Sequence, residues 1–96
     1  NFIIVRYLCQ NMGKGETDIL RPWVVEALTY YGGAATLIDI SKHVWENHSE
    51  DLEKSGDLFY RWQYVLRWAG TTLRHEGTIL PAEDSERGVW VLNPSR

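Results

Sequence analysis

The stretch "LRWAGTTLRHEGTILPAEDSERGVWVL", from Leu66 to Leu92, decides the predicted fold. Its first half has helical spacing and ends at Gly77, because glycine readily takes the left-handed conformation that closes a helix. Two short strand candidates, TILPA and VWVL, follow and flank the charged connection EDSERG. Pro81 limits the first candidate to a sheet edge or a strand end, since proline has no N–H to donate. The stretch therefore predicts a helix followed by a β-hairpin.

The helix of this stretch is predicted to begin upstream, at about Leu58, and to run to His75. Its apolar residues recur at helical spacing. The apolar stripe consists of Phe59, Trp62, Leu66, Ala69 and Leu73, with Leu58 and Val65 on its flank. The opposite face carries Tyr60, Tyr64, Arg67, Thr71 and Arg74, with Trp68 and His75 beside it. We therefore expect this helix to bury one face and to present the other to solvent or to a partner.

Another helix is predicted from Asp18 to Tyr31. Pro22 suits its first turn, where the missing N–H costs nothing, and Gly32-Gly33 stops it. Its expected core residues are Leu20, Trp23, Val24, Ala27, Leu28 and Tyr31.

A middle helix is predicted from Leu37 to about Asn47. Thr36 can cap it, with Asp39 three residues later, and residues 34–36 before it form a short strand candidate. The polar stretch HSEDLEKSGD then reads as an acidic connection without a periodic apolar face. The expected core residues of the middle helix are Leu37, Ile40, Val44 and Trp45.

The order helix, short strand, helix, helix, hairpin matches a winged helix-turn-helix. The predicted fold class is thus α+β, with three helices and a small C-terminal β-hairpin wing. We expect one domain over residues 12–96. Residues 1–11 precede Met12, the only methionine, and are expected to be an upstream or vector-derived segment. The alternative for residues 1–11 is a genuine edge strand or arm that packs on a partner.

Charge argues against indiscriminate nucleic-acid binding, because the chain carries a net charge of −3 and phosphate contacts supply most of that affinity. The charge is unevenly placed, however. Residues 39–57 hold six acids and two lysines, whereas residues 58–81 hold three arginines and one glutamate. This uneven distribution allows a local basic face on an acidic domain.

The segments RWAGTTLRHEGTIL and RGVWVL resemble the N-terminal winged-helix domain of the Mrr family of restriction endonucleases. That family typically shows a Trp-Ala pair, a Leu four residues on, a closing Gly and an Arg-Gly-Val-Trp strand. The corresponding residues here are Trp68-Ala69, Leu73, Gly77 and Arg87-Gly88-Val89-Trp90. The upstream VVEALTYYGGAAT also resembles the family's opening helix and Gly-Gly turn, so the resemblance covers roughly residues 18–92.

The resemblance implies a DNA-binding module, which in Mrr proteins precedes a separate nuclease domain that cuts modified DNA. We expect a departure from that pattern, because residues 1–96 contain no segment that matches the nuclease domain. Glu53 and Lys54 superficially suggest a nuclease element that holds Mg²⁺, but they are adjacent and sit in the polar connection. The resemblance thus implies a recognition module that is free-standing or part of a longer protein.

The candidate DNA contacts lie on the polar face of the third helix. Arg67 and Arg74 lie two turns apart with Thr71 between them, and arginine can fork onto a guanine edge or onto phosphates. Hydroxyl groups of threonine and tyrosine can donate to phosphate oxygens, which position rather than specify. The candidate DNA-binding residues are Tyr60, Gln63, Tyr64, Arg67, Thr71, Arg74 and Arg87. The alternative for this face is a merely solvated helix surface.

Two of the arginines have structural alternatives. Arg87 lies at the wing tip beside three acids, whereas a wing that tracks phosphates normally needs positive charge. Arg87 can still reach DNA, but packing of its guanidinium on an aromatic ring such as Trp90 is the slightly favoured alternative. Arg61, at the margin of the face, can pair with the acidic connection.

Most tryptophans match core positions, namely Trp23, Trp45, Trp62 and Trp90. Trp68 lies off the stripe, so we expect it under the wing or on a self-association surface with Tyr30 or Tyr31, because aromatic residues favour interfaces.

No catalysis, cofactor or metal site is expected. His43 and His48 are five residues apart, and the sequence has no Cys-x-x-Cys or His-x-x-x-His pair. No phosphate-binding loop or nucleophile elbow is present. The single Cys9 fits a reducing compartment, and no apolar run approaches the ~18 residues of a membrane span. We therefore expect a cytoplasmic protein.

The sequence therefore predicts a module that binds double-stranded DNA, with its third helix in the major groove. It would serve as a transcription regulator or as the recognition part of a restriction system. The alternatives are a winged helix for protein–protein interaction or dimerisation, and an enzyme fragment without its catalytic domain. We expect a symmetric homodimer, because two half-sites multiply the affinity for DNA.

Overall fold

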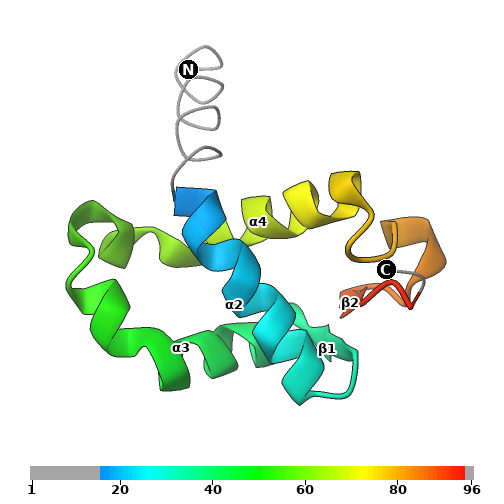
Figure 1. The fold of residues 1–96 in the computed structure, drawn as a ribbon, viewed down its shortest axis with the longest axis horizontal. Helices are drawn as coiled ribbons and strands as arrows, with labels where there is room; N and C mark the ends of the chain where they lie inside the picture. The colour runs from blue at the N-terminus through cyan, green and yellow to red at the C-terminus, as the bar shows by residue number, and fades with distance from the viewer. Residues whose placement is uncertain (1–15, 95–96) are drawn as a thin grey trace, which may run out of the picture.

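The computed structural model describes residues 16–94, so the expectation for residues 1–11 lies outside the described residues. Within that range the chain forms three helices and a small sheet, and the sheet lies toward one end of the molecule (Figure 1). The helices are α2 (Glu16–Tyr30), α3 (Leu37–Glu53) and α4 (Trp62–Glu76), and the strands are β1 (Ala34–Thr36) and β2 (Val89–Val91). Two short 3-10 turns, η1 (Gly56–Tyr60) and η2 (Ala82–Asp84), complete the described elements. The expected α+β class is confirmed.

Helix α2 crosses the molecule and packs against both α3 and α4. Its expected stripe is confirmed at Leu20, Val24, Ala27 and Leu28, which are fully buried. Two expectations for this helix are wrong. Pro22 lies inside the helix rather than in its first turn, because α2 already includes Glu16. Tyr31 is 39% exposed, because the helix ends before it.

The glycine stop of α2 is confirmed. Gly32 and Gly33 have φ angles of 84° and 108°, which side chains with a Cβ rarely adopt. The N–H of Gly33 donates to the carbonyl of Leu28 at 2.7 Å, so the turn satisfies a helix-end carbonyl. The chain then enters β1, which contacts α2.

The sheet joins the middle of the chain to its end. β1 pairs antiparallel with β2, and Ala35 faces Trp90 in the register. Both residues are buried, so the sheet turns one side toward the helices.

The expected hairpin forms only in part. Its first arm is reduced to a bridge between Ile79 and Leu92 and to one hydrogen bond from Leu80 N–H to the carbonyl of Val91. Pro81 follows and cannot donate, and the chain bends into η2. The segment 78–92, called the C-terminal segment below, is therefore one strand with a short bridged arm.

Helix α3 is longer than expected. The Thr36 cap is confirmed, because the Asp39 N–H donates to Thr36 Oγ1 at 3.2 Å. The helix does not end near Asn47 but reaches Glu53, with a kink at His48, where φ is −131°. After the kink, a second helical stretch buries Leu52 fully. The polar sequence around Leu52 does not predict this burial.

Helix α4 starts later than expected. Residues 56–60 form η1, and Arg61 breaks the helical path with φ of −139° before α4 begins at Trp62. Leu58 is buried rather than on the flank, since the tighter 3-10 turn aims it inward. The stop at Gly77 is confirmed, with φ of 81°.

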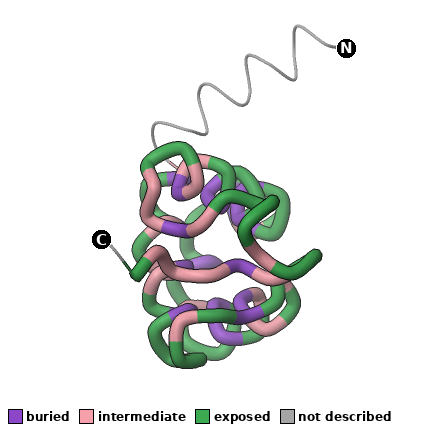
Figure 2. The backbone as a smooth tube through the Cα atoms, turned by 90° about the vertical axis from the view of Figure 1, so that its right-hand side faces the viewer, coloured by how far each residue is buried: buried purple, intermediate pink, exposed green. Residues whose placement is uncertain are grey.

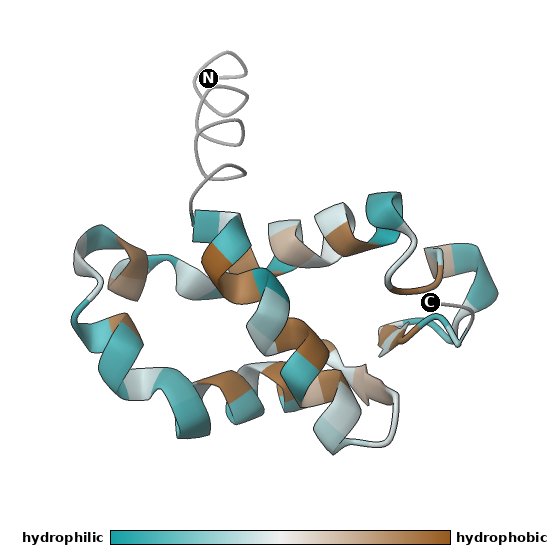
Figure 3. Ribbon diagram, in the orientation of Figure 1, coloured by the Kyte–Doolittle hydropathy of each residue, from teal (hydrophilic) through white to brown (hydrophobic). Residues whose placement is uncertain are grey.

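The core lies between the three helices and the sheet. Figure 2 shows that buried positions recur along the described backbone. Figure 3 shows that apolar positions alternate with polar ones along each helix. Trp62 and Trp90 are buried as expected, and Trp23 is partly buried against the core. Trp45 is 41% exposed, so its expected core position is wrong. Of the helices in residues 16–94, none combines the length and apolar character that a bilayer-spanning segment needs.

Candidate functional site

The solvent face of α4 carries the expected polar residues in one line. Gln63, Arg67, Thr71 and Arg74 follow one another at intervals of four, four and three residues, so they lie along one helical stripe. Gln63, Arg67 and Thr71 are exposed, whereas Arg74 is partly buried. These four residues are called the α4 stripe below.

Arg67 is the most available of these side chains. It is exposed and forms no ion pair with any residue of the described range. Thr71 is less free, because its hydroxyl donates to the Arg67 carbonyl at 3.3 Å. It can still accept a hydrogen bond, but donation to a phosphate would require breaking this bond.

Arg74 has a structural role. Its guanidinium carbon lies 5.8 Å from the centre of the Trp90 ring, which fits a cation–π contact. Its Nε is buried and has no hydrogen-bond partner among the described residues. The expectation that Arg87 covers Trp90 is therefore wrong, because Arg74 takes this place from α4. Arg87 is exposed, as are Glu83 and the other acids beside it.

Arg61 is also removed from the candidate surface. Its Nη2 donates to both carboxylate oxygens of Glu16, at 2.7 and 2.6 Å. The expected pairing with the acidic connection is wrong, because the break before α4 turns Arg61 toward the start of α2. Arg21 is likewise paired, with Asp18 and Glu76.

A groove of about 640 Å³ runs between α3 and α4, and is called the α3–α4 groove below. Its wall on α4 includes Gln63, Tyr64 and Arg67. Its wall on α3 includes Lys42, which is exposed and, like Arg67, forms no ion pair within residues 16–94. Sequence reasoning missed Lys42. The available signal was helical spacing, because Lys42 lies four residues after Ile38 and three before Trp45 and so shares a face of α3 with both.

Aromatic rings make up much of this surface. Trp45 stacks beside Trp62, with ring centres 6.2 Å apart and planes 12° apart. Tyr64 is 44% exposed and meets Trp68 edge to face at 6.3 Å. Tyr60 is also exposed and touches Phe59. Trp68 thus lies beside Tyr64, as helical spacing predicts, and its role in a self-association surface stays a prediction.

A second concavity, of about 330 Å³, lies between the end of α4 and the C-terminal segment. Thr71, Arg74 and His75 line it from α4, and Pro81 and Glu83 line it from the other side. The first two residues of the α4 stripe therefore line the α3–α4 groove, and the last two line the concavity beside the C-terminal segment.

A histidine cluster lies away from the stripe. The Nε2 atoms of His43 and His48 lie 3.0 and 2.9 Å from one oxygen, Oε2 of Glu26. His48 also stacks on Trp23, with ring centres 4.1 Å apart. Hydrogen bonding by His48, with a smaller contribution from His43, holds the pKa of Glu26 below its ordinary value against partial burial, which acts in the opposite direction.

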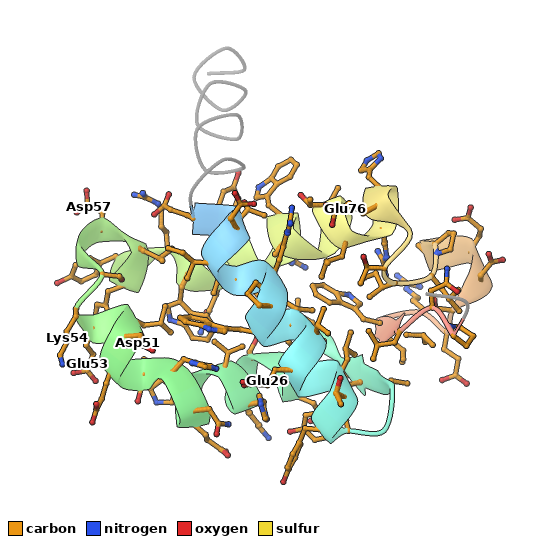
Figure 4. All side chains as sticks on the ribbon, viewed as in Figure 1. Glu26, Asp51, Glu53, Lys54, Asp57 and Glu76 are labelled. Carbon is orange, nitrogen blue, oxygen red and sulfur yellow. The ribbon has the colours of Figure 1, made fainter. Side chains whose placement is uncertain are left out.

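The kink in α3 explains this cluster. A straight helix does not place residues five apart on one face, and the non-helical backbone at His48 removes that limit. Figure 4 marks Glu26 on α2 and Asp51 on α3, and Asp51 lies 3.8 Å from Nδ1 of His48. No group of three or more metal-ligating side chains in residues 16–94 has the arrangement to hold a metal ion.

Comparison with known proteins adds no relative. No protein-family model, no curated protein and no solved structure matches this chain. The resemblance to the Mrr N-terminal domain therefore stays a prediction.

Proposed function

We propose that this chain is a winged-helix module that binds double-stranded DNA through Gln63, Arg67 and Thr71, the exposed residues of the α4 stripe. The observation that carries the proposal is Arg67, an exposed arginine without an ion pair, placed between Gln63 and Thr71 on a solvent-facing helix. The major groove of DNA admits one α-helix, and arginine and glutamine are side chains that read base edges there.

The surroundings of α4 support this proposal. α3 precedes α4, and the C-terminal segment follows it as the candidate wing, which is the order of a helix-turn-helix with a wing. Lys42 adds a cation across the α3–α4 groove from Arg67. The acids at the tip of the C-terminal segment argue that contact runs through α4 and Lys42 rather than through Arg87.

A titration of fluorescent duplex DNA of random sequence at about 50 mM and about 200 mM salt tests the proposal. Arg67→Ala should weaken binding by about 1–3 kcal/mol, because a forked contact is lost. Lys42→Ala should weaken binding evenly across sequences and lower the salt dependence by about one phosphate contact.

Lys54→Ala is the matched control. Lys54 is exposed, forms no ion pair within residues 16–94 and follows the end of α3 (Figure 4). Lys54→Ala removes one positive charge, as Lys42→Ala does, and should leave the affinity for DNA nearly unchanged. Absence of DNA binding by the wild type at the lower salt concentration would refute the proposal.

A second candidate function is protein–protein interaction or dimerisation. It is favoured by the aromatic patch of Tyr60, Tyr64 and Trp68, since aromatic residues are enriched at protein interfaces. Sedimentation at several protein concentrations separates the two functions. A self-association that persists at high salt, together with no affinity for DNA, would establish the second one.

A further inference from the structure

The α3–α4 groove has the size and the lining of a small-molecule site. Its volume of about 640 Å³ lies within the range of about 300–1,000 Å³ that is typical of ligand pockets. Trp45 and Trp62 give it two nearly parallel rings, and Ile38 stands 68% exposed on the α3 side. Such a lining favours a ligand with a flat apolar body.

The charges of the groove favour an anion. Lys42 on α3 and Arg67 on α4 both line it, and neither forms an ion pair with a described residue. Glu46 also lines it, on the next turn of α3 after Lys42. Two cations against one carboxylate leave room for a single negative charge, so charge complementarity selects a monoanion.

We propose that the α3–α4 groove binds an aromatic carboxylate of one or two rings. Its rings lie on the exposed faces of Trp45 and Tyr64, and its carboxylate lies between Lys42 and Arg67. Guanidinium groups bind carboxylates through two parallel hydrogen bonds, which orients the ligand as well as holding it. A ligand of this size fits within the groove and occupies part of its volume.

The ligand and DNA would compete, a consequence that rests on the proposed DNA-binding function. Gln63 and Arg67 belong both to the groove and to the surface proposed for DNA. A ligand held by Arg67 blocks its contact with a base or phosphate, and the coupling is reciprocal. The module would then release DNA when the aromatic acid accumulates.

The indole N–H resonances of the five tryptophans provide a direct test without DNA. Titration with β-naphthoate should shift the signals of Trp45 and Trp62 in a saturable way, after assignment with Trp45→Phe and Trp62→Phe. The chemical shift of the Trp90 signal should not change, because Trp90 lies on β2 outside the groove, with Arg74 over its ring. β-Naphthylmethanol, which has the same rings without the charge, and octanoate, which has the charge without the rings, should both bind more weakly.

Two charge variants locate the carboxylate. Lys42→Ala and Arg67→Ala should each weaken β-naphthoate binding roughly five- to tenfold, as expected for one charge-assisted contact at an open site. Neither should change the affinity for β-naphthylmethanol. Lys54→Ala should bind β-naphthoate as the wild type does, since Lys54 does not line the groove.

Several results would overturn the inference. The first is the absence of a saturable shift. The second is equal affinity for β-naphthoate and β-naphthylmethanol. The third is an affinity for β-naphthoate in Lys42→Ala and Arg67→Ala that equals that of the wild type. A shift of the Trp45 signal with protein concentration alone would show that a second copy covers the groove, which also overturns it. Binding of β-naphthoate by a protein that does not bind DNA would leave this inference standing and refute only the proposed function.

Discussion

Gly70 lies on the buried face of α4, where the Trp90 ring from β2 packs over it. A Cβ at this position would lie 2.7 and 2.8 Å from Cζ2 and Cζ3 of Trp90, closer than carbon atoms can approach. Trp90 has little room to move, because the Arg74 guanidinium lies 5.8 Å from the ring centre and the strand holds its backbone. The glycine thus sets how closely the sheet approaches α4.

Gly70→Ala is expected to destabilise the fold by up to about 2 kcal/mol. Alanine improves the helix propensity of α4 by roughly 1 kcal/mol, but overpacking against a fixed ring costs about 1–3 kcal/mol. Urea denaturation measures the net effect. In a Trp90→Phe background, where the overlapping ring atoms are absent, the same change should be neutral or stabilising, and an equal loss in both backgrounds would contradict the packing argument.

Each end of α4 is set by its own backbone conformation. The helix begins after the break at Arg61, which the Glu16 carboxylate holds by two hydrogen bonds. It ends at Gly77, where the Thr78 N–H donates to the Leu73 carbonyl at 2.9 Å. This turn leads into the bridge at Ile79, so the end of the helix also positions the C-terminal segment.

Gly77→Ala is expected to cost about 1–2 kcal/mol, because a left-handed residue with a Cβ is strained by roughly that amount. Thermal or urea unfolding measures it. Gly77→Asn is the matched comparison and should cost less, since asparagine tolerates this conformation better than alanine does. Equal losses for the two variants would show that the turn, rather than the residue, absorbs the strain.

Across the whole molecule, Glu26 ties α2 to both halves of the kinked α3. His43 precedes the kink and His48 forms it, and both bond the same carboxylate oxygen. The acids around the end of α3, including Asp51, Glu53 and Asp57, gather at the end of the molecule opposite the C-terminal segment (Figure 4). One group of carboxylates therefore lies at the α3 end of the molecule, separate from the acids at the tip of the C-terminal segment.

The Glu26 carboxylate should make a pH-dependent contribution to stability. Because its pKa in the folded state is lowered from 4.5, the contribution is present above that pH and is lost as the pH falls through the lower folded value. The difference in unfolding free energy between wild type and Glu26→Gln should thus shrink as the pH is lowered from about 5 to about 3. Urea denaturation over this range measures it.

Glu53→Gln is the control, since Glu53 is exposed and bonds neither histidine. Its difference from wild type reports the loss of a carboxylate outside the cluster. A difference for Glu26→Gln that stays constant or grows toward low pH would contradict the role given to the histidine contacts.

Local patterns were sufficient for much of this fold. The stops at Gly32 and Gly77, the Thr36 cap and the apolar stripe of α2 were all predicted, because each depends on residues within one or two helical turns. The solvent-facing placement of Arg67 and Thr71 was predicted for the same reason. Local pattern failed at His48 and Arg61, where single backbone angles end or redirect a helix without a glycine or proline to mark them.

Contacts between distant residues came from packing alone. Arg61 binds Glu16 across 45 residues, and His43 binds Glu26 across 17, because α2 lies against the other two helices. The same packing pairs β2 with β1, places Arg74 rather than Arg87 over Trp90, and sets Lys42 across a groove from Arg67. Spacing along the chain places side chains on the faces of their own helix, but which faces meet depends on how helices and strands bury their apolar sides together.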